Sequence, residues 1–163
     1  MKYRKLKNTD LDVSVLSYGA SSLGSVFREI NEAEGIKTVH EVIDSGINLI
    51  DVSPYYGLTK AETVLGKALV DIPRDKYILS SKAGRYGENE FDFSRKGILT
   101  SVENSLQRLH TDYSEREYIT LAYDYIIENH GNIEQYLLSK GISQDVLERV
   151  KTQLGQEIEV VVE

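Results

Sequence analysis

The stretch "INLIDVSPYYG", residues 47–57, indicates how this chain folds. A short apolar run ends at a proline and is closed by a glycine, which is typical of a buried strand followed by a turn. Strand side chains alternate between two faces, so Asp51 lies in phase with Ile47 and Leu49. The pattern predicts a strand whose last inward-facing side chain is a carboxylate.

Strands and helices alternate on both sides of this stretch. A hairpin is expected around Asn8, Thr9 and Asp10. Each later strand-like run precedes a segment with helical spacing of its apolar residues, and these predicted helices cover residues 31–46, 60–70 and 94–109. The residues expected to pack are Ala61, Val64, Leu65, Ala68 and Leu69 in the second helix and Leu99, Val102, Leu106 and Leu109 in the third. Asn31 is placed to cap the first helix, and Gly46 is placed to end it. Strict alternation of this kind requires parallel strands joined by crossovers.

The alternation stops at "RLHTDYSEREY", residues 108–118. Residues 1–113 carry 15 Lys or Arg and 16 Asp or Glu, whereas residues 114–163 carry 4 and 10. The second part reads as helices, the first of which runs from a Ser114–Glu117 capping box to about Asn129. Its helices are expected to cover the open side of the sheet through four tyrosines, Tyr118, Tyr123, Tyr125 and Tyr136. The predicted fold is α/β: a partial (β/α) barrel with an N-terminal hairpin and three βα units over residues 1–113, followed by a helical tail over residues 114–163.

Composition narrows the classes of function. The 163 residues are 40% hydrophobic and 28% charged, with a net charge of −7, which is ordinary for a soluble globular protein. Nothing favours binding to nucleic acid or to a membrane, and no secretory signal is evident, so a cytoplasmic protein is expected. The absence of cysteine excludes disulfides and thiolate chemistry, and no metal site is predicted.

Two strand ends bring together groups that could carry chemistry. Asp51 ends the second strand of the alternation, and Lys82 ends the third, "YILSSK". Tyr55 and Tyr56 lie in the loop between them, and a cation beside a phenol favours the phenolate, so proton transfer is one interpretation. A buried ion pair beside packing tyrosines is the other, and spacing alone leaves both open. His40 falls on the apolar stripe of a helix and is expected to have a packing role.

Residues 3–112 resemble the N-terminal part of the aldo-keto reductases, and within them the group that oxidises sugars such as L-galactose and L-fucose. The matching segments are "RKLKNTDLDVSVLSYGASSLG", "IDSGINLIDVSPYYG", "AETVLGKAL", "YILSSKAG" and "SVENSLQRLHTDY". The resemblance implies that Asp51, Tyr56 and Lys82 occupy three of four catalytic positions. Tyr56 would be the acid/base, Lys82 would activate it, and Asp51 would hold Lys82. Gly19, Ala20 and Ser21, with Asp51, would approach the nicotinamide of NAD or NADP.

The resemblance also implies a fourth strand after the position of Tyr113, which in the family ends in a catalytic histidine. His110 and His130 do not stand in a matching context. Residues 116–154 instead resemble the C-terminal helices of bacterial tyrosine phosphatases, whose catalytic cysteine this chain lacks.

Two functions are expected on these grounds. The first is an impaired oxidoreductase of sugars or small carbonyl compounds. The alternative is a non-catalytic chimeric or truncated protein that acts as an interaction module. An open sheet edge would favour self-association, and residues 157–163, "EIEVVVE", are predicted to pair with such an edge.

Overall fold

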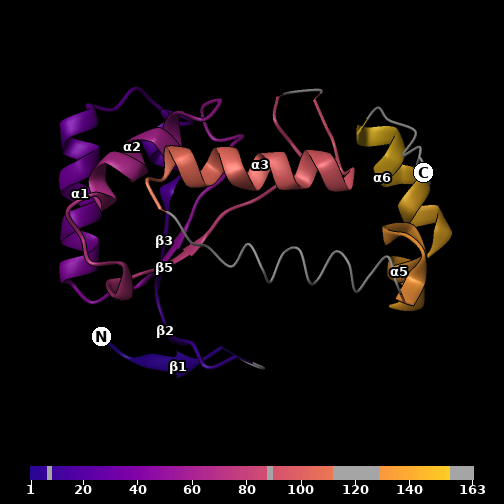
Figure 1. Cartoon of the computed structure of the whole chain (residues 1–163), viewed down its shortest axis with the longest axis horizontal. Coiled ribbons are helices and arrows are strands. Elements are labelled where there is room, and N and C mark those ends of the chain that lie inside the picture. Colours follow the sequence, from indigo (N-terminus) through magenta and orange to yellow (C-terminus); the bar gives the residue numbers. More distant parts are fainter. Residues whose placement is uncertain (7–8, 88–89, 112–128, 155–163) are drawn as a thin grey trace.

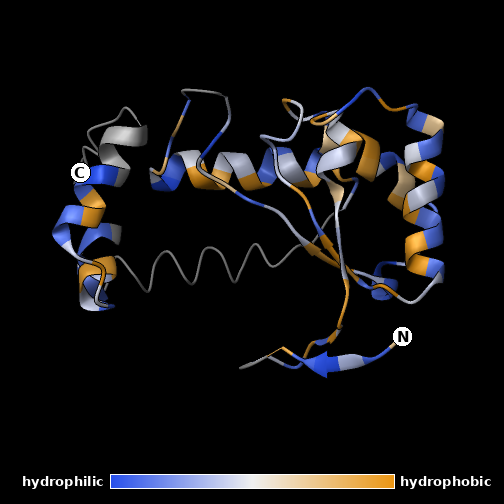
Figure 2. Ribbon diagram, turned by 180° about the vertical axis from the view of Figure 1, so that it is seen from behind, coloured by the Kyte–Doolittle hydropathy of each residue, from blue (hydrophilic) through white to orange (hydrophobic). Residues whose placement is uncertain are grey.

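The computed structural model describes residues 1–6, 9–87, 90–111 and 129–154. The chain begins with two antiparallel strands, β1 (Tyr3–Lys5) and β2 (Asp12–Ser14), in which Arg4 lies opposite Val13. The predicted hairpin is confirmed, although part of its turn falls outside the described residues. Figure 2 shows that β1 is mostly hydrophilic, whereas the strands at the centre of the molecule carry hydrophobic residues.

A parallel sheet of three strands follows the hairpin. Its strands are β3 (Ser17–Gly19), β4 (Leu49–Asp51) and β5 (Ile78–Ser80), in the order β3-β4-β5. Both pairings are parallel, so the predicted βα crossovers are confirmed. The connecting helices are α1 (Glu32–Asp44) and α2 (Lys60–Leu69), and α3 (Arg95–Arg108) follows β5 (Figure 1). Two short 3₁₀ helices, η1 (Ala20–Gly24) and η2 (Arg74–Lys76), complete this part.

The helix ends follow the capping signals in the sequence. The side chain of Asn31 accepts hydrogen bonds from the backbone N–H groups of Ala33 and Glu34, as predicted for the start of α1. Gly46, just beyond α1, has a φ of 87°, a left-handed conformation that suits glycine. Ser94 caps α3 by accepting from the N–H of Gly97.

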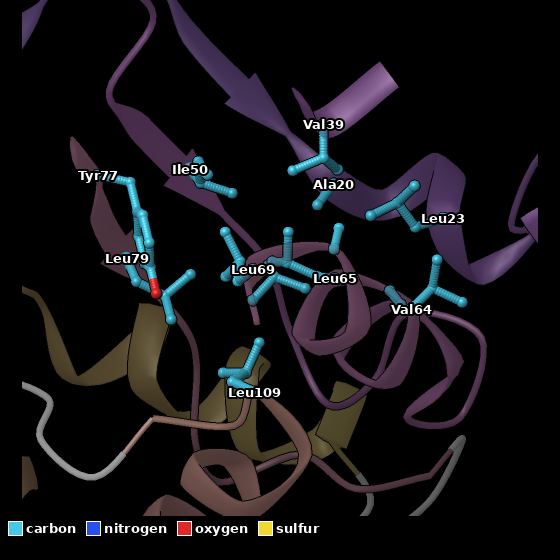
Figure 3. Close-up of a cluster of buried hydrophobic side chains, with 13 residues drawn as sticks. Ala20, Leu23, Val39, Ile50, Val64, Leu65, Leu69, Tyr77, Leu79 and Leu109 are labelled. Atoms are coloured by element: carbon cyan, nitrogen blue, oxygen red, sulfur yellow. The ribbon is translucent and has the colours of Figure 1, made fainter. Parts of the chain in front are cut away.

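The hydrophobic core lies between the sheet and its helices. The middle residue of each strand faces it, so that Tyr18, Ile50 and Leu79 form one row in register. Figure 3 shows Leu65 and Leu69 of α2 close to Ile50 and Leu79 of the sheet, with Leu109 at the end of α3 closing the cluster. The apolar side predicted for α2 is buried as expected, over Ala61, Val64, Leu65, Ala68 and Leu69.

Two packing details refine the sequence predictions. His40 packs as expected, since its Nε2 lies 2.8 Å from the carbonyl oxygen of Ala68 and ties α1 to α2. In α3 the buried face is more polar than predicted. Ser101 and Ser105 are buried beside Val102, whereas the expected core residues Leu99 and Leu106 are half-buried.

Two further helices form the end of the described chain, α5 (Ile133–Ser139) and α6 (Gln144–Leu154). Both were predicted. They lie beyond the N-terminal end of α3, which begins at Arg95 (Figure 1). Tyr136, predicted to cover the sheet, instead packs edge-on against the His130 ring at 5.1 Å between centroids.

Several predictions concern residues outside the described part. They are the helix from Ser114 to about Asn129, the edge pairing of residues 157–163, and the covering role of Tyr118, Tyr123 and Tyr125. Among the residues that the structure does describe, no helix is long and apolar enough to cross a membrane.

Candidate functional site

The carboxyl ends of the three parallel strands form one edge of the sheet. In register there, Gly19 lies beside Asp51 and Asp51 lies beside Ser80. These residues point to the side of the sheet opposite the core, because strand side chains alternate. Gly19 and Ser80 are exposed and Asp51 is half-buried. The same short strands thus carry the core on one face and a polar row on the other.

Asp51 and Lys82 form an ion pair across this edge. Lys82 Nζ lies 2.6 Å from Asp51 Oδ1 and also donates to the carbonyl oxygen of Val52 at 3.2 Å. Ser80 Oγ donates to the other carboxylate oxygen of Asp51 at 3.2 Å. Both charged side chains are nearly half exposed, at 41% for Asp51 and 47% for Lys82.

The environment raises the pKa of Lys82 above its ordinary value. Partial burial on its own would lower this pKa, because it disfavours the charged amine. The hydrogen bond and negative charge of Asp51 act in the opposite direction, with a further contribution from Tyr56, and together they outweigh burial. Lys82 is held as a cation across the physiological pH range.

Tyr56 faces this cation from the loop after β4. Lys82 Nζ lies 5.3 Å from the centroid of the Tyr56 ring. The loop is tightly turned, since the N–H of Tyr56 donates to Ser53 and the carbonyl of Tyr56 accepts from Ala61. The structure therefore brings together the three residues that the sequence placed at one site: Asp51, Tyr56 and Lys82.

Two glycines allow the Tyr56 loop to approach η1. A Cβ on Gly24 would meet the carbonyl oxygen of Tyr56, and a Cβ on Gly57 would clash with the carbonyl oxygen of Gly24. Gly57 also has a φ of 62°. Backbone packs directly on backbone here, so the position of Tyr56 depends on two residues without side chains.

The three residues predicted to approach a nicotinamide lie in different surroundings. Gly19 ends β3 on the polar side of the sheet, and a Cβ built on it would meet nothing within 4 Å. Ala20 is fully buried in the core, so its side chain does not face the polar row. Ser21 is half-buried in η1. A side chain at position 19 would therefore extend into open space on the polar side of the sheet.

A hollow of about 750 Å³ opens beside Tyr56. Its walls include Val26, Tyr55, Leu58, Tyr86 and Glu90. The loop after Lys82 forms one of these walls, because Arg85 and Phe91 pair there in antiparallel fashion. Within the described part of the chain, no group of acidic or histidine side chains is arranged to hold a metal ion.

Sequence reasoning missed the loop that forms this wall. Arg85 lies over the Tyr55 ring at 3.7 Å and also faces Phe91 at 5.4 Å, which joins the loop to the Tyr56 loop. The sequence signal was available in "GRYGENEFDF", residues 84–93, where aromatic residues flank a Gly-Glu-Asn segment typical of turns.

A buried charge next to the site was missed as well. Glu62 is fully buried in α2. Its position could have revealed this burial, because Glu62 falls three residues before Leu65 and seven before Leu69 on the buried side of the helix.

Comparison with known proteins agrees with these features. Residues 15–122 match the model of the aldo/keto reductase family, and this match covers more than half of the chain. The chain belongs to the aldo/keto reductase family. The match runs past Tyr113, where the predicted first segment ends, and stops before α5 and α6.

Several enzymes of the family are similar over the same part. L-galactose dehydrogenase from Arabidopsis thaliana is 47% identical over 115 residues, which are 69% of this chain and 36% of that protein. D-arabinose 1-dehydrogenase from Saccharomyces cerevisiae is 37% identical over 125 residues, 73% of this chain and 37% of that protein. The chain thus spans little more than a third of the length of these relatives.

A solved structure supports the fold assignment. An aldo-keto reductase from Bacillus halodurans, in its holo form, superposes with a TM-score of 0.61 at 34% identity. The superposition covers 70% of this chain and 38% of that one. The α/β part described above therefore corresponds to a portion of the family's barrel.

Proposed function

We propose that this chain is an oxidoreductase of sugars or other small carbonyl compounds that works with a nicotinamide cofactor. The observation that carries the proposal is the gathering of Asp51, Lys82 and Tyr56 at the carboxyl edge of a parallel sheet, where ligands of α/β proteins bind. The similarity to enzymes named as dehydrogenases of galactose and arabinose supports the class of substrate.

Each of the three residues has a role that its surroundings support. Tyr56 borders the hollow and would give a proton to, or take one from, the substrate oxygen. The Lys82 cation lies next to its ring and would place a positive charge beside the reacting oxygen, and Asp51 would hold that cation in place. A nicotinamide, when bound, supplies or accepts the hydride.

The residues present fit the nicotinamide end of such a cofactor. The open space at Gly19 adjoins Asp51 in the same row, and the polar face there is exposed. Gly19 and Asp51 are the residues that would lie against the ring, whereas Ala20 and Ser21 would contribute through their backbone. We propose that either NAD or NADP binds.

Cofactor titration tests this proposal. NADH and NADPH are added to the whole chain while nicotinamide fluorescence is followed, and saturable binding is expected. Tyr56→Phe should then abolish turnover of an aldose and leave cofactor affinity nearly unchanged, because it removes only the hydroxyl. No saturation at millimolar concentrations of either cofactor would overturn the enzymatic function.

A second candidate function is a non-catalytic interaction module. It is favoured by the outer strands of the described sheet, β3 and β5, on which Ser17, Gly19 and Ser80 are exposed. Open strand edges recruit further strands, including those of a second copy. Sedimentation at increasing concentration tests it, and a monomer at every concentration would exclude self-association. The resemblance of residues 116–154 to phosphatase helices stays a prediction.

A further inference from the structure

The buried carboxylate of Glu62 connects three elements next to the site. Ser81 Oγ donates to Glu62 Oε1 at 2.7 Å, and Arg108 Nε donates to Glu62 Oε2 at 2.7 Å. Glu62 belongs to α2, Ser81 follows β5, and Arg108 ends α3. Arg108 also donates to Ser105 Oγ at 3.2 Å. Both oxygens of the carboxylate are thus used inside the fold.

Stability alone does not explain why a charge occupies this place. Buried ion pairs can often be replaced by apolar residues of similar volume without loss of stability, because desolvation offsets much of the attraction. Glu62 lies on the otherwise apolar side of α2, where a leucine would pack. What an apolar residue could not provide is the acceptor for Ser81.

Ser81 lies between two residues of the site. Ser80 and Lys82 both contact Asp51 on the polar face, whereas Ser81 points the other way and reaches Glu62. At the end of β5, the N–H of Val52 donates to the carbonyl of Ser80. After Ser80, the hydrogen bond from the Ser81 side chain to Glu62 anchors the backbone that carries Lys82.

We propose that Glu62, held by Arg108, is a positioning residue that fixes the end of β5 through Ser81 and so holds Lys82 against Asp51. The positioning role rests on the proposed function in one respect, because the proposed function is what makes the placement of Lys82 important. The contacts that place Lys82 are a property of the folded chain. Helices α2 and α3 thereby determine the geometry of a site on the opposite face of the sheet.

The test compares two serines of the same network. Ser81→Ala removes the link from Glu62 to β5, whereas Ser105→Ala removes a hydroxyl that accepts from Arg108 within α3. The readout is the pH dependence of acylation of the Lys82 amine, followed by mass spectrometry with exposed Lys37 as internal reference. No turnover is needed, so a chain that binds no nicotinamide still gives a result.

The expected result is specific to one serine. Ser81→Ala should loosen the pair with Asp51 and lower the acylation midpoint of Lys82 by about 0.5 pH unit or more, which corresponds to roughly threefold faster labelling at a fixed pH. Ser105→Ala should leave the midpoint at the wild-type value. Ser81→Thr keeps the hydroxyl, so its midpoint should also equal that of the wild type and not that of Ser81→Ala.

Equal shifts in Ser81→Ala and Ser105→Ala, or no shift in either, would overturn the proposal. Circular dichroism first establishes that each variant melts cooperatively. If Ser81→Ala does not, Ser81→Cys takes its place, since a thiol has nearly the same shape and is only a weak donor. Failure of the cofactor titration with a positive result here would refute the proposed enzymatic function and leave the positioning role intact.

Discussion

Two ion pairs in this protein have nearly the same length and opposite surroundings. Glu62 Oε2 lies 2.7 Å from Arg108 Nε, and Asp51 Oδ1 lies 2.6 Å from Lys82 Nζ. The first pair is enclosed, with Glu62 at 0% and Arg108 at 23% exposure, whereas the second is almost half exposed. Burial rather than distance decides what each pair does: the first holds helices to the sheet, and the second stays accessible to a ligand.

The largest effect is expected from breaking the enclosed pair. Glu62→Gln keeps the shape of the side chain but leaves the Arg108 guanidinium without its carboxylate, which should cost about 3 kcal/mol of unfolding free energy. Urea denaturation measures it. Lys67→Met is the matched control, because it breaks a pair with Glu32 of similar length, 2.8 Å, at the surface. That variant should lose at most about 1 kcal/mol, and equal losses would contradict the comparison.

A second test compares a glycine of the helical side, Gly66 in α2, with a glycine of the polar side, Gly19 in β3. A Cβ on Gly66 of α2 would clash with the carbonyl oxygen of Arg108, so Gly66→Ala should push α2 and α3 apart. We expect a net loss of about 2 kcal/mol, even though alanine is the better helix former. Gly19→Ala, with nothing within 4 Å of its Cβ, should change stability by less than about 0.5 kcal/mol. Thermal melts followed by circular dichroism distinguish the two.

The accessible pair should respond to pH instead. Asp51→Asn removes the group that raises the pKa of Lys82, so this pKa should fall, because burial then acts unopposed by that carboxylate. A raised lysine pKa in the folded state stabilises the protein at pH values below the ordinary value of 10.5, and this contribution disappears as the pH rises through the folded-state pKa.

Wild type should therefore exceed Asp51→Asn by at most about 1 kcal/mol at neutral pH, since both side chains are well solvated. The difference should shrink in the alkaline range. Urea denaturation at three pH values, neutral, mildly alkaline and strongly alkaline, measures it, with the Lys67→Met variant as the reference for a surface pair on the helical side. A difference that grows with pH would contradict the assigned role of Asp51.

The two pairs also differ in how far the sequence predicted them. Asp51 and Lys82 were found because each falls at the end of a strand-like run in phase with apolar neighbours, and parallel strands present their ends along one edge. In the structure Asp51 ends β4, and Lys82 lies two residues beyond β5. Local patterns are enough for that inference. The apolar side of α2 was predicted for the same reason, since helical spacing is visible within a few turns.

The partner of Glu62 could not be predicted in this way. Arg108 lies 46 residues further along the chain, and no local period joins the two. The position of Arg108 depends on how α3 packs, and α3 buries Ser101 and Ser105, whereas Leu99 and Leu106, expected in the core, are half-buried. The hollow beside Tyr56 escaped prediction because it depends on contacts of Arg85 across two loops.

The smallest expected effect concerns strain in the loop that carries Tyr56. Gly57, Leu58 and Thr59 all have positive φ values, of 62°, 48° and 76°. This conformation costs a non-glycine residue roughly 1 kcal/mol or more, and Leu58 is 66% exposed, so packing returns little of it. Glycine in its place would relieve the strain, although its freedom in the unfolded chain offsets part of the gain.

Leu58→Gly should therefore raise the unfolding free energy by about 0.5 kcal/mol. Val70→Gly is the control, because Val70 is similarly exposed but has a φ of −53°, and glycine there should only destabilise. Thermal melts of both variants give the sign of each change. If both lose stability equally, Leu58 is unstrained; a gain in Leu58→Gly alone would locate strain in the loop that carries Tyr56.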